Sequence, residues 1–195
     1  MKDASERHVV CILPWDGTYP QIAPSVWLAD GVCIVGNVTI GERSSVWFNT
    51  VIRGDVNSVW IGAETNVQDL CVLHVTGRHP LWIGDRVTIG HRAIVHGARV
   101  EEGALIGMGA CILDGAHVGS YSLVAAGAVV REGQVVPPGV LVAGVPARIV
   151  RELTAEERRQ LEESARHYVE YAARYRELRA QERATGSGRS GRRRA

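Results

Sequence analysis

The sequence predicts a mainly β protein, a left-handed parallel β-helix of hexapeptide repeats followed by a C-terminal α-helix. Aliphatic residues recur every six positions, glycine follows many of them, and a helical pattern opens after residue 150. Three short strands then make one triangular coil, with the aliphatic residue of each hexad on the axis. A β-sandwich would instead alternate every two residues. The residues in six-residue register are Ile40, Val46, Ile52, Ile61, Val67, Leu73, Ile83, Ile89, Val95, Ile106, Ile112, Val118, Val124 and Val130.

Interruptions of this period place three polar side chains at one edge. Steps of nine, ten and eleven residues each follow the third aliphatic residue of a coil, the last step running from Val95 to Ile106. The extra residues should therefore leave from the same corner of successive coils. Arg53, His74 and His96 directly follow those aliphatic residues and are expected to stack. Neighbouring coils lie about 4.8 Å apart, so His74 and His96 can share one ion.

A third histidine, His91, lies elsewhere in its coil. It precedes His96 by five residues, and an extended run of five spans roughly 16 Å. A neighbouring chain must therefore bring His91 to the pair formed by His74 and His96. Neutral imidazole is the commonest zinc ligand, and three imidazoles leave a fourth position for water, as in catalytic zinc sites. Zn²⁺ is the predicted ion, and Fe²⁺ or Co²⁺ also suits three imidazoles.

The other segments are assigned from composition. Residues 1–20 are read as an N-terminal extension, 21–150 as the β-helix, 151–183 as an amphipathic helix and 184–195 as a disordered basic tail. The T-x-x-E capping box formed by Thr154 and Glu157 starts the helix, which is expected from 155 to about 182. Its apolar stripe should pack on the β-helix wall or a neighbouring subunit. The stripe consists of Leu161, Ala165, Tyr168, Ala172 and Tyr175.

Composition excludes several classes of protein. The 195 residues are 46% hydrophobic and 22% charged, with a formal net charge of +1. Arginines crowd the last seven residues rather than forming a basic stripe on the folded body, so a nucleic-acid partner is not expected. No apolar run is long enough to cross a membrane. The four cysteines form no CxxC pair, which indicates buried thiols in a reducing, cytoplasmic setting.

Six short strings carry a resemblance. They are Ile52-Arg-Gly-Asp55, Thr65-Asn-Val-Gln-Asp69, Val72-Leu-His74, Gly90-His91, Val95-His-Gly97 and Gly107-Met-Gly109. Over about residues 10 to 180 the chain resembles the gamma-class carbonic anhydrase family, in its short-loop, carbonic anhydrase-like branch. The resemblance implies a homotrimer that hydrates carbon dioxide to bicarbonate with a metal-bound hydroxide. It also implies that each interface site takes His74 and His96 from one subunit and His91 from the next.

The resemblance also implies roles for other residues. Gln68 matches the side chain that orients the metal-bound hydroxide, and Asn66 matches a polar neighbour that helps to hold carbon dioxide. Arg53 and Asp55 match an ion pair between subunits, and Tyr168 matches a tyrosine on the C-terminal helix. These five residues complete the predicted catalytic set.

The sequence departs from the family pattern where a proton carrier is expected. Val56 stands in place of a glutamate, residues 75–80 are too short for an acidic loop, and Glu170 replaces an asparagine. His79, Glu170 or buffer would then carry the proton. Two other functions stay open: acyl transfer from coenzyme A or hydrolysis of its thioesters with one histidine as base, and a metal-stabilised structural trimer.

Overall fold

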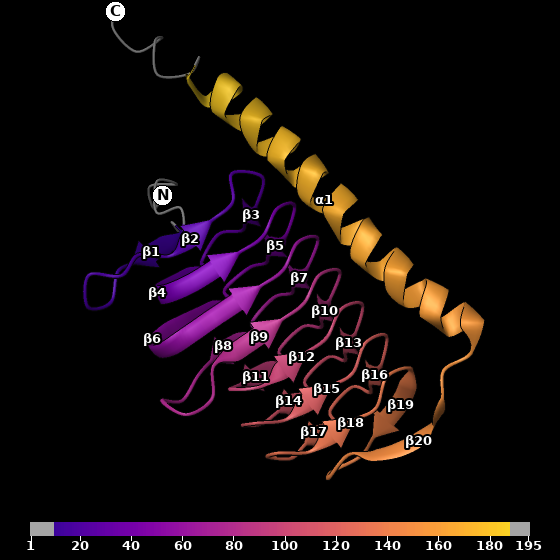
Figure 1. Ribbon diagram of the computed structural model, residues 1–195. Coiled ribbons are helices and arrows are strands. Elements are labelled where there is room, and N and C mark those ends of the chain that lie inside the picture. Colours follow the sequence, from indigo (N-terminus) through magenta and orange to yellow (C-terminus); the bar gives the residue numbers. More distant parts are fainter. Residues whose placement is uncertain (1–9, 188–195) are drawn as a thin grey trace, which may run out of the picture.

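The chain folds into a stack of triangular coils with one long helix lying along it (Figure 1). The computed structural model describes residues 10–187, and the side chains of residues 10–182. Short parallel strands line the three faces of the stack, which we call faces A, B and C. The predicted mainly β, hexapeptide-repeat β-helix with a C-terminal helix is confirmed. No helix in the described part of the chain is long and apolar enough to span a membrane.

Faces A and B belong to one sheet of 12 strands, because two long strands bend around the corner between them. Face A holds β1 (Cys11–Leu13), the first halves of β4 (Cys33–Ile40) and β6 (Val51–Ile61), β8 (Val72–His74), β11 (Ile94–His96), β14 (Cys111–Ile112) and β17 (Val129–Val130). Face B holds β2 (Gln21–Ile22), the second halves of β4 and β6, β9 (Leu81–Ile83), β12 (Arg99–Val100), β15 (His117–Val118) and β18 (Val135–Val136).

Face C is a sheet of eight strands. Its strands are β3 (Trp27–Leu28), β5 (Ser45–Val46), β7 (Asn66–Val67), β10 (Thr88–Ile89), β13 (Leu105–Ile106), β16 (Leu123–Val124), β19 (Val140–Ala143) and β20 (Arg148–Glu152). Only β20 is antiparallel within this face; it pairs with β19 and closes the end of the stack.

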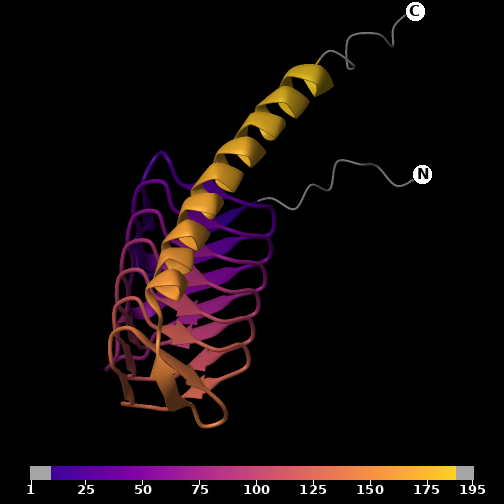
Figure 2. The same ribbon diagram turned by 90° about the vertical axis from the view of Figure 1, so that its right-hand side faces the viewer.

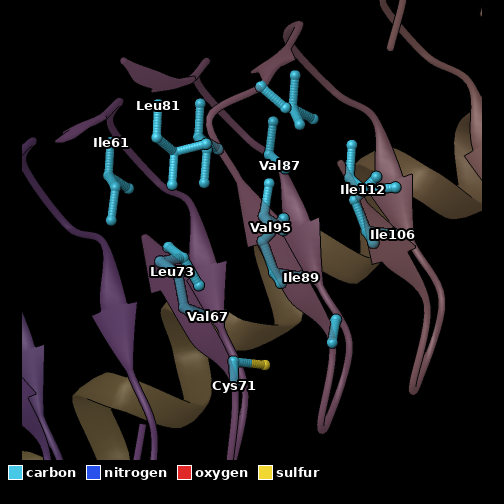
Figure 3. Packing of buried hydrophobic residues seen from close by; sticks show 14 of the residues in the cluster. Ile61, Val67, Cys71, Leu73, Leu81, Val87, Ile89, Val95, Ile106 and Ile112 are labelled. Carbon is cyan, nitrogen blue, oxygen red and sulfur yellow. The ribbon is translucent and has the colours of Figure 1, made fainter. Parts of the chain in front are cut away.

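Inward-pointing aliphatic side chains form one column per face and fill the axis (Figure 3). On face A, for example, Ile52, Leu73, Val95 and Ile112 are aligned from coil to coil and are 0% exposed. Each such side chain contributes about 1.5–3 kcal/mol on burial, so the six-residue period is the main determinant of the fold.

One step of the predicted period is wrong in detail. The eleven residues from Val95 to Ile106 contain Val100, which pairs with Ile83 and is fully buried on face B. The interval is therefore a step of five followed by a step of six. No long loop leaves the coil between Val95 and Ile106. Val100 stays in the inward column of face B, because the shorter step shortens only the corner between β11 and β12.

The boundaries of the β-helix are wider than predicted. Strand β1 pairs in parallel with β4, so coil pairing starts at Cys11 inside the predicted N-terminal extension. At the other end, β20 runs across the predicted boundary at residue 150, because antiparallel pairing with β19 satisfies backbone groups of the last coil.

Helix α1 (Ala155–Ser187) lies on face C, where it contacts β3, β5, β7 and β10 (Figure 2). The capping box is confirmed: Thr154 N donates to Glu157 Oε2 (2.9 Å), and Glu157 N donates to Thr154 Oγ1 (3.2 Å). The helix runs to Ser187, so residues 184–187 of the predicted tail are helical, as the preceding Arg- and Ala-containing stretch favours. The tail from 188 to 195 lies outside the described residues.

The apolar stripe of α1 packs on the β-helix wall, as predicted. Leu161, Ala165 and Ala172 are 5%, 1% and 5% exposed. Tyr168 and Tyr175 pack edge-on against Trp47, each with ring centroids 5.3 Å away. These contacts fix the position of α1 relative to β5, β7 and β10.

We expect the Leu161→Ala variant to lower the free energy of unfolding by about 2–5 kcal/mol, because it leaves a cavity under α1. Leu178→Ala is the matched control on the same helix, since Leu178 is 55% exposed, and its effect should stay within about 0.5 kcal/mol. Denaturant unfolding of both variants measures the difference. Equal losses would contradict the packing of α1 on face C.

Candidate metal centre

His74 and His96 stack at the end of face A, as the period predicts. Arg53, His74 and His96 pair in register on β6, β8 and β11. Nδ1 of His74 lies 2.9 Å from Nε2 of His96. We call His74 and His96, with the carboxylates that bind them, the paired-histidine group.

In each ring of this group, the nitrogen that faces away from the other histidine is hydrogen-bonded to a carboxylate. Nε2 of His74 lies 3.1 Å from Oδ1 of Asp55, and Nδ1 of His96 lies 2.6 Å from Oδ1 of Asp114. A carboxylate only accepts hydrogen bonds, so those two nitrogens carry the ring hydrogens of the neutral imidazoles. The nitrogens that face each other then both present lone pairs. A metal ion beside the two nitrogens, or a proton shared between them, offsets the repulsion of these lone pairs, so two rings held in this way by carboxylates fit a metal.

Asp55 links Arg53 to His74. Its Oδ2 accepts from Arg53 Nη1, and its Oδ1 accepts from His74 and from Val56 N (2.9 Å). Partial desolvation raises the pKa of Asp55, but the hydrogen bonds from Arg53 and His74 outweigh it and hold the pKa below its ordinary value. The Arg53–Asp55 pair thus forms within the single chain, where the family resemblance implies an ion pair between subunits.

Sequence analysis did not identify Asp114. It follows Leu113, which continues β14 beside His96, so the coil register brings Asp114 near that ring but does not set the direction of its side chain. A Cβ on Gly97 would come within 2.5 Å of Asp114 Oδ1 and 2.9 Å of His79 Cβ. Gly97 therefore leaves space for both side chains, and His79 lies beside the paired-histidine group.

His91 lies at a different corner, between faces C and A. It sits in the turn from β10 to β11, where Arg92 adopts a left-handed φ of 60°. Nδ1 of His91 lies 2.8 Å from Oδ2 of Asp69, whose Oδ1 accepts from Phe48 N (3.0 Å). His91 thus repeats the pattern of the other two rings: Nδ1 contacts a carboxylate, and Nε2 is the nitrogen that could bind a metal.

Gln68 and Asn66 lie beside His91, and with Asp69 these residues form what we call the single-histidine group. His91 N donates to Gln68 Oε1 (3.1 Å), and Gln68 Nε2 donates to Asn66 Oδ1 (3.1 Å). Tyr168 is close to this group: burial raises the pKa of its phenol, and the charge of Asp69 raises it further.

The structure divides the predicted site residues between these two groups. Arg53, Asp55, His74 and His96 lie at the A–B corner, whereas Asn66, Gln68, His91 and Tyr168 lie at or near the C–A corner. Within the described residues, no set of three or more His, Cys, Asp or Glu side chains can hold one metal ion. Glu170 is exposed on α1 and pairs with Arg166 (3.5 Å).

An apolar outer column of face A runs up to the paired-histidine group. Val51, Val72, Ile94, Cys111 and Val129 are aligned along it. In the single chain Val72 and Ile94 are 40% and 39% exposed, two residues before His74 and His96. Exposed aliphatic side chains in a continuous row are typical of a contact surface.

Two families of hexapeptide repeats match the coils: bacterial transferase hexapeptide (six repeats) over residues 97–132, and the hexapeptide repeat of succinyl-transferase over residues 80–113. A solved structure of a putative acetyltransferase from Bacillus cereus has a TM-score of 0.86 and 47% identity. It covers 87% of this chain and 98% of that one.

Two curated relatives identify the family. The carbonic anhydrase of Geobacillus kaustophilus is 51% identical over 87% of this chain and 93% of its own length. Gamma carbonic anhydrase 3, mitochondrial, of Arabidopsis thaliana is 46% identical over 88% of this chain and 68% of its own length. With the hexapeptide coils, these relatives show that the chain belongs to the gamma-class carbonic anhydrase family.

Proposed function

We propose that this protein is a metal-dependent enzyme that reversibly hydrates carbon dioxide to bicarbonate, at sites completed between the chains of a homotrimer. The observation that supports the proposal is the position of two ring nitrogens of His74 and His96, which lie 2.9 Å apart while carboxylates hold the opposite nitrogens. His91 shows the same pattern at another corner.

The separation of the histidines between two corners suggests how the chains would associate. If the paired-histidine group of one chain meets the single-histidine group of the next, each contact joins different surfaces, and such contacts form a ring when the rotation between neighbouring chains closes. The family resemblance implies three chains. The contact would also bury the exposed column that contains Val72 and Ile94. Association would therefore gain hydrophobic free energy at the place where it completes the site.

The donor set favours zinc, with Fe²⁺ and Co²⁺ as alternatives that three imidazoles also bind. Zinc held by three imidazoles supplies hydroxide near neutral pH. The carboxylates of Asp55, Asp69 and Asp114 would each fix the tautomer and the direction of one ligand ring. A cytoplasmic location stays a prediction from composition.

The other residues bind and orient. Gln68 would hold an oxygen atom of the substrate and product, Asn66 would orient the amide of Gln68, and Arg53 would keep Asp55 ionised against His74. Tyr168 would close the wall beside Asp69. The proton would leave through His79 or a buffer base, because Glu170 is exposed and paired with Arg166.

The direct test is to purify the protein without oxygen, measure its metal content, and assay carbon dioxide hydration beside hydrolysis of coenzyme A thioesters. We expect one ion per chain and metal-dependent hydration that a chelator abolishes. Thioester hydrolysis without hydration would favour the acyl chemistry of other hexapeptide proteins. Bound metal with neither activity would favour a structural trimer.

Asp114 provides a second test. Because it holds His96 Nδ1 at 2.6 Å, Asp114→Ala should raise the dissociation constant for zinc on the order of 10-fold to 100-fold. Asp85→Ala is the control, since the carboxylate of Asp85 accepts a hydrogen bond from Ala63 N (2.7 Å) at another corner. Competition with a chromophoric chelator measures both. Unchanged affinity in Asp114→Ala would remove Asp114 from the metal centre.

A further inference from the structure

Face C carries a polar interruption in an otherwise apolar outer column beneath α1. The aligned outward residues are Trp27, Ser45, Asn66, Thr88, Leu105, Leu123 and Leu141. Asn66 and Thr88 are only 1% and 4% exposed. A buried polar group is destabilising unless its hydrogen bonds are made, so packing of α1 alone would favour apolar residues here.

These residues differ from the other buried polar groups of the coils. Ser44, Thr50, Thr65 and Ser122 each donate to a backbone carbonyl of a neighbouring coil, which supports the corners of the stack. Asn66 and Thr88 instead bond mainly to other side chains. The folding of the β-helix does not account for them.

Together they form a chain of hydrogen bonds from α1 to the single-histidine group. Ser164 Oγ on α1 lies 3.2 Å from Thr88 Oγ1. Asn66 Nδ2 donates to Thr88 Oγ1 (2.9 Å), and Gln68 Nε2 donates to Asn66 Oδ1 (3.1 Å). Gln68 itself is 6% exposed.

Backbone groups next to Gln68 and Asn66 set the direction of the hydrogen bonds in this chain. His91 N can only donate, so the oxygen of Gln68 must face it and the nitrogen must face Asn66. Asn66 therefore presents its oxygen to Gln68 and its nitrogen to Thr88. The carbonyl of Val87, which can only accept, lies 3.4 Å from the same nitrogen and agrees with this orientation.

We propose that Thr88 and Ser164 are positioning residues that lock the amides of Asn66 and Gln68, so that Gln68 presents its second N–H to an oxygen of bicarbonate. This inference rests on the proposed function. One hydrogen of Gln68 Nε2 is used on Asn66, and the other remains for a ligand. A flipped amide would place a carbonyl oxygen there, which would repel a negatively charged oxygen. Helix α1 thus supports the site through Ser164.

The test is Thr88→Val, which keeps the shape of the side chain and removes the hydroxyl. Turnover of the metal-loaded trimer should fall on the order of 10-fold while metal content and KM stay near wild type. Thr88→Ser should restore turnover, and Ser164→Ala should lower it by less. Ser45→Ala is the matched control, because Ser45 lies in the same column but its hydroxyl accepts from Trp47 Nε1 (3.0 Å) and not from the chain that reaches Gln68. It should leave turnover unchanged.

A second readout is independent of activity. In metal-free protein labelled with ¹⁵N, the side-chain amide hydrogens of Asn66 and Gln68 should exchange slowly with water, and Thr88→Val should speed their exchange while Ser45→Ala does not. Unchanged exchange and turnover in Thr88→Val would overturn the proposal. If Thr88→Val fails to fold, turnover and amide exchange in Ser164→Ala test the proposal in its place. If wild-type protein does not hydrate carbon dioxide, the proposed function is refuted. The hydrogen-exchange measurement would then still decide whether Thr88 orients the amides.

Discussion

In-register stacking of the coils is the constraint on which every other feature depends. Burial of one aliphatic side chain per strand fixes the register, and a slip of one residue would turn each column from the axis to the outside. With the register fixed, His74 lies directly over His96 at the spacing of paired strands. Two histidines that are 22 positions apart in the sequence are thus brought together without any specialised loop.

The triangular cross-section then determines where chemistry can occur. The described side chains that orient ligands lie at two corners, with Asp55, His74, His96 and Asp114 at one and Asp69 and His91 at the other. A straight stack cannot fold these corners onto each other, because its axis is close-packed with aliphatic residues. The proposed site that uses all three histidines therefore requires a second chain.

Much of this arrangement could be predicted from sequence, because a six-residue period is a one-dimensional signal. The alignment of Arg53, His74 and His96 follows from it, and the structure confirms the alignment. Val100 was missed because a step of five and a step of six add up to one interruption. Asp114 was missed because its contact depends on the direction of a corner side chain, which the period does not encode.

The role of α1 shows the same limit. Its capping box and apolar stripe predict a helix on the wall, but the contact between Ser164 and Thr88 joins residues 76 positions apart. Such a contact depends on how far the helix slides along face C, which Tyr168, Tyr175 and Trp47 set by packing. Local sequence patterns contain no information on that offset.

The central claim is that two chains complete each site, and a mixing experiment tests it most directly. His74→Ala and His91→Ala are prepared separately, and each homotrimer should lack metal-dependent hydration. The two proteins are then unfolded, mixed equally and refolded, with mixed trimers verified by native mass spectrometry. In a cyclic trimer, random assembly should restore about a quarter of the wild-type sites. Mixed trimers as inactive as their components would contradict the account.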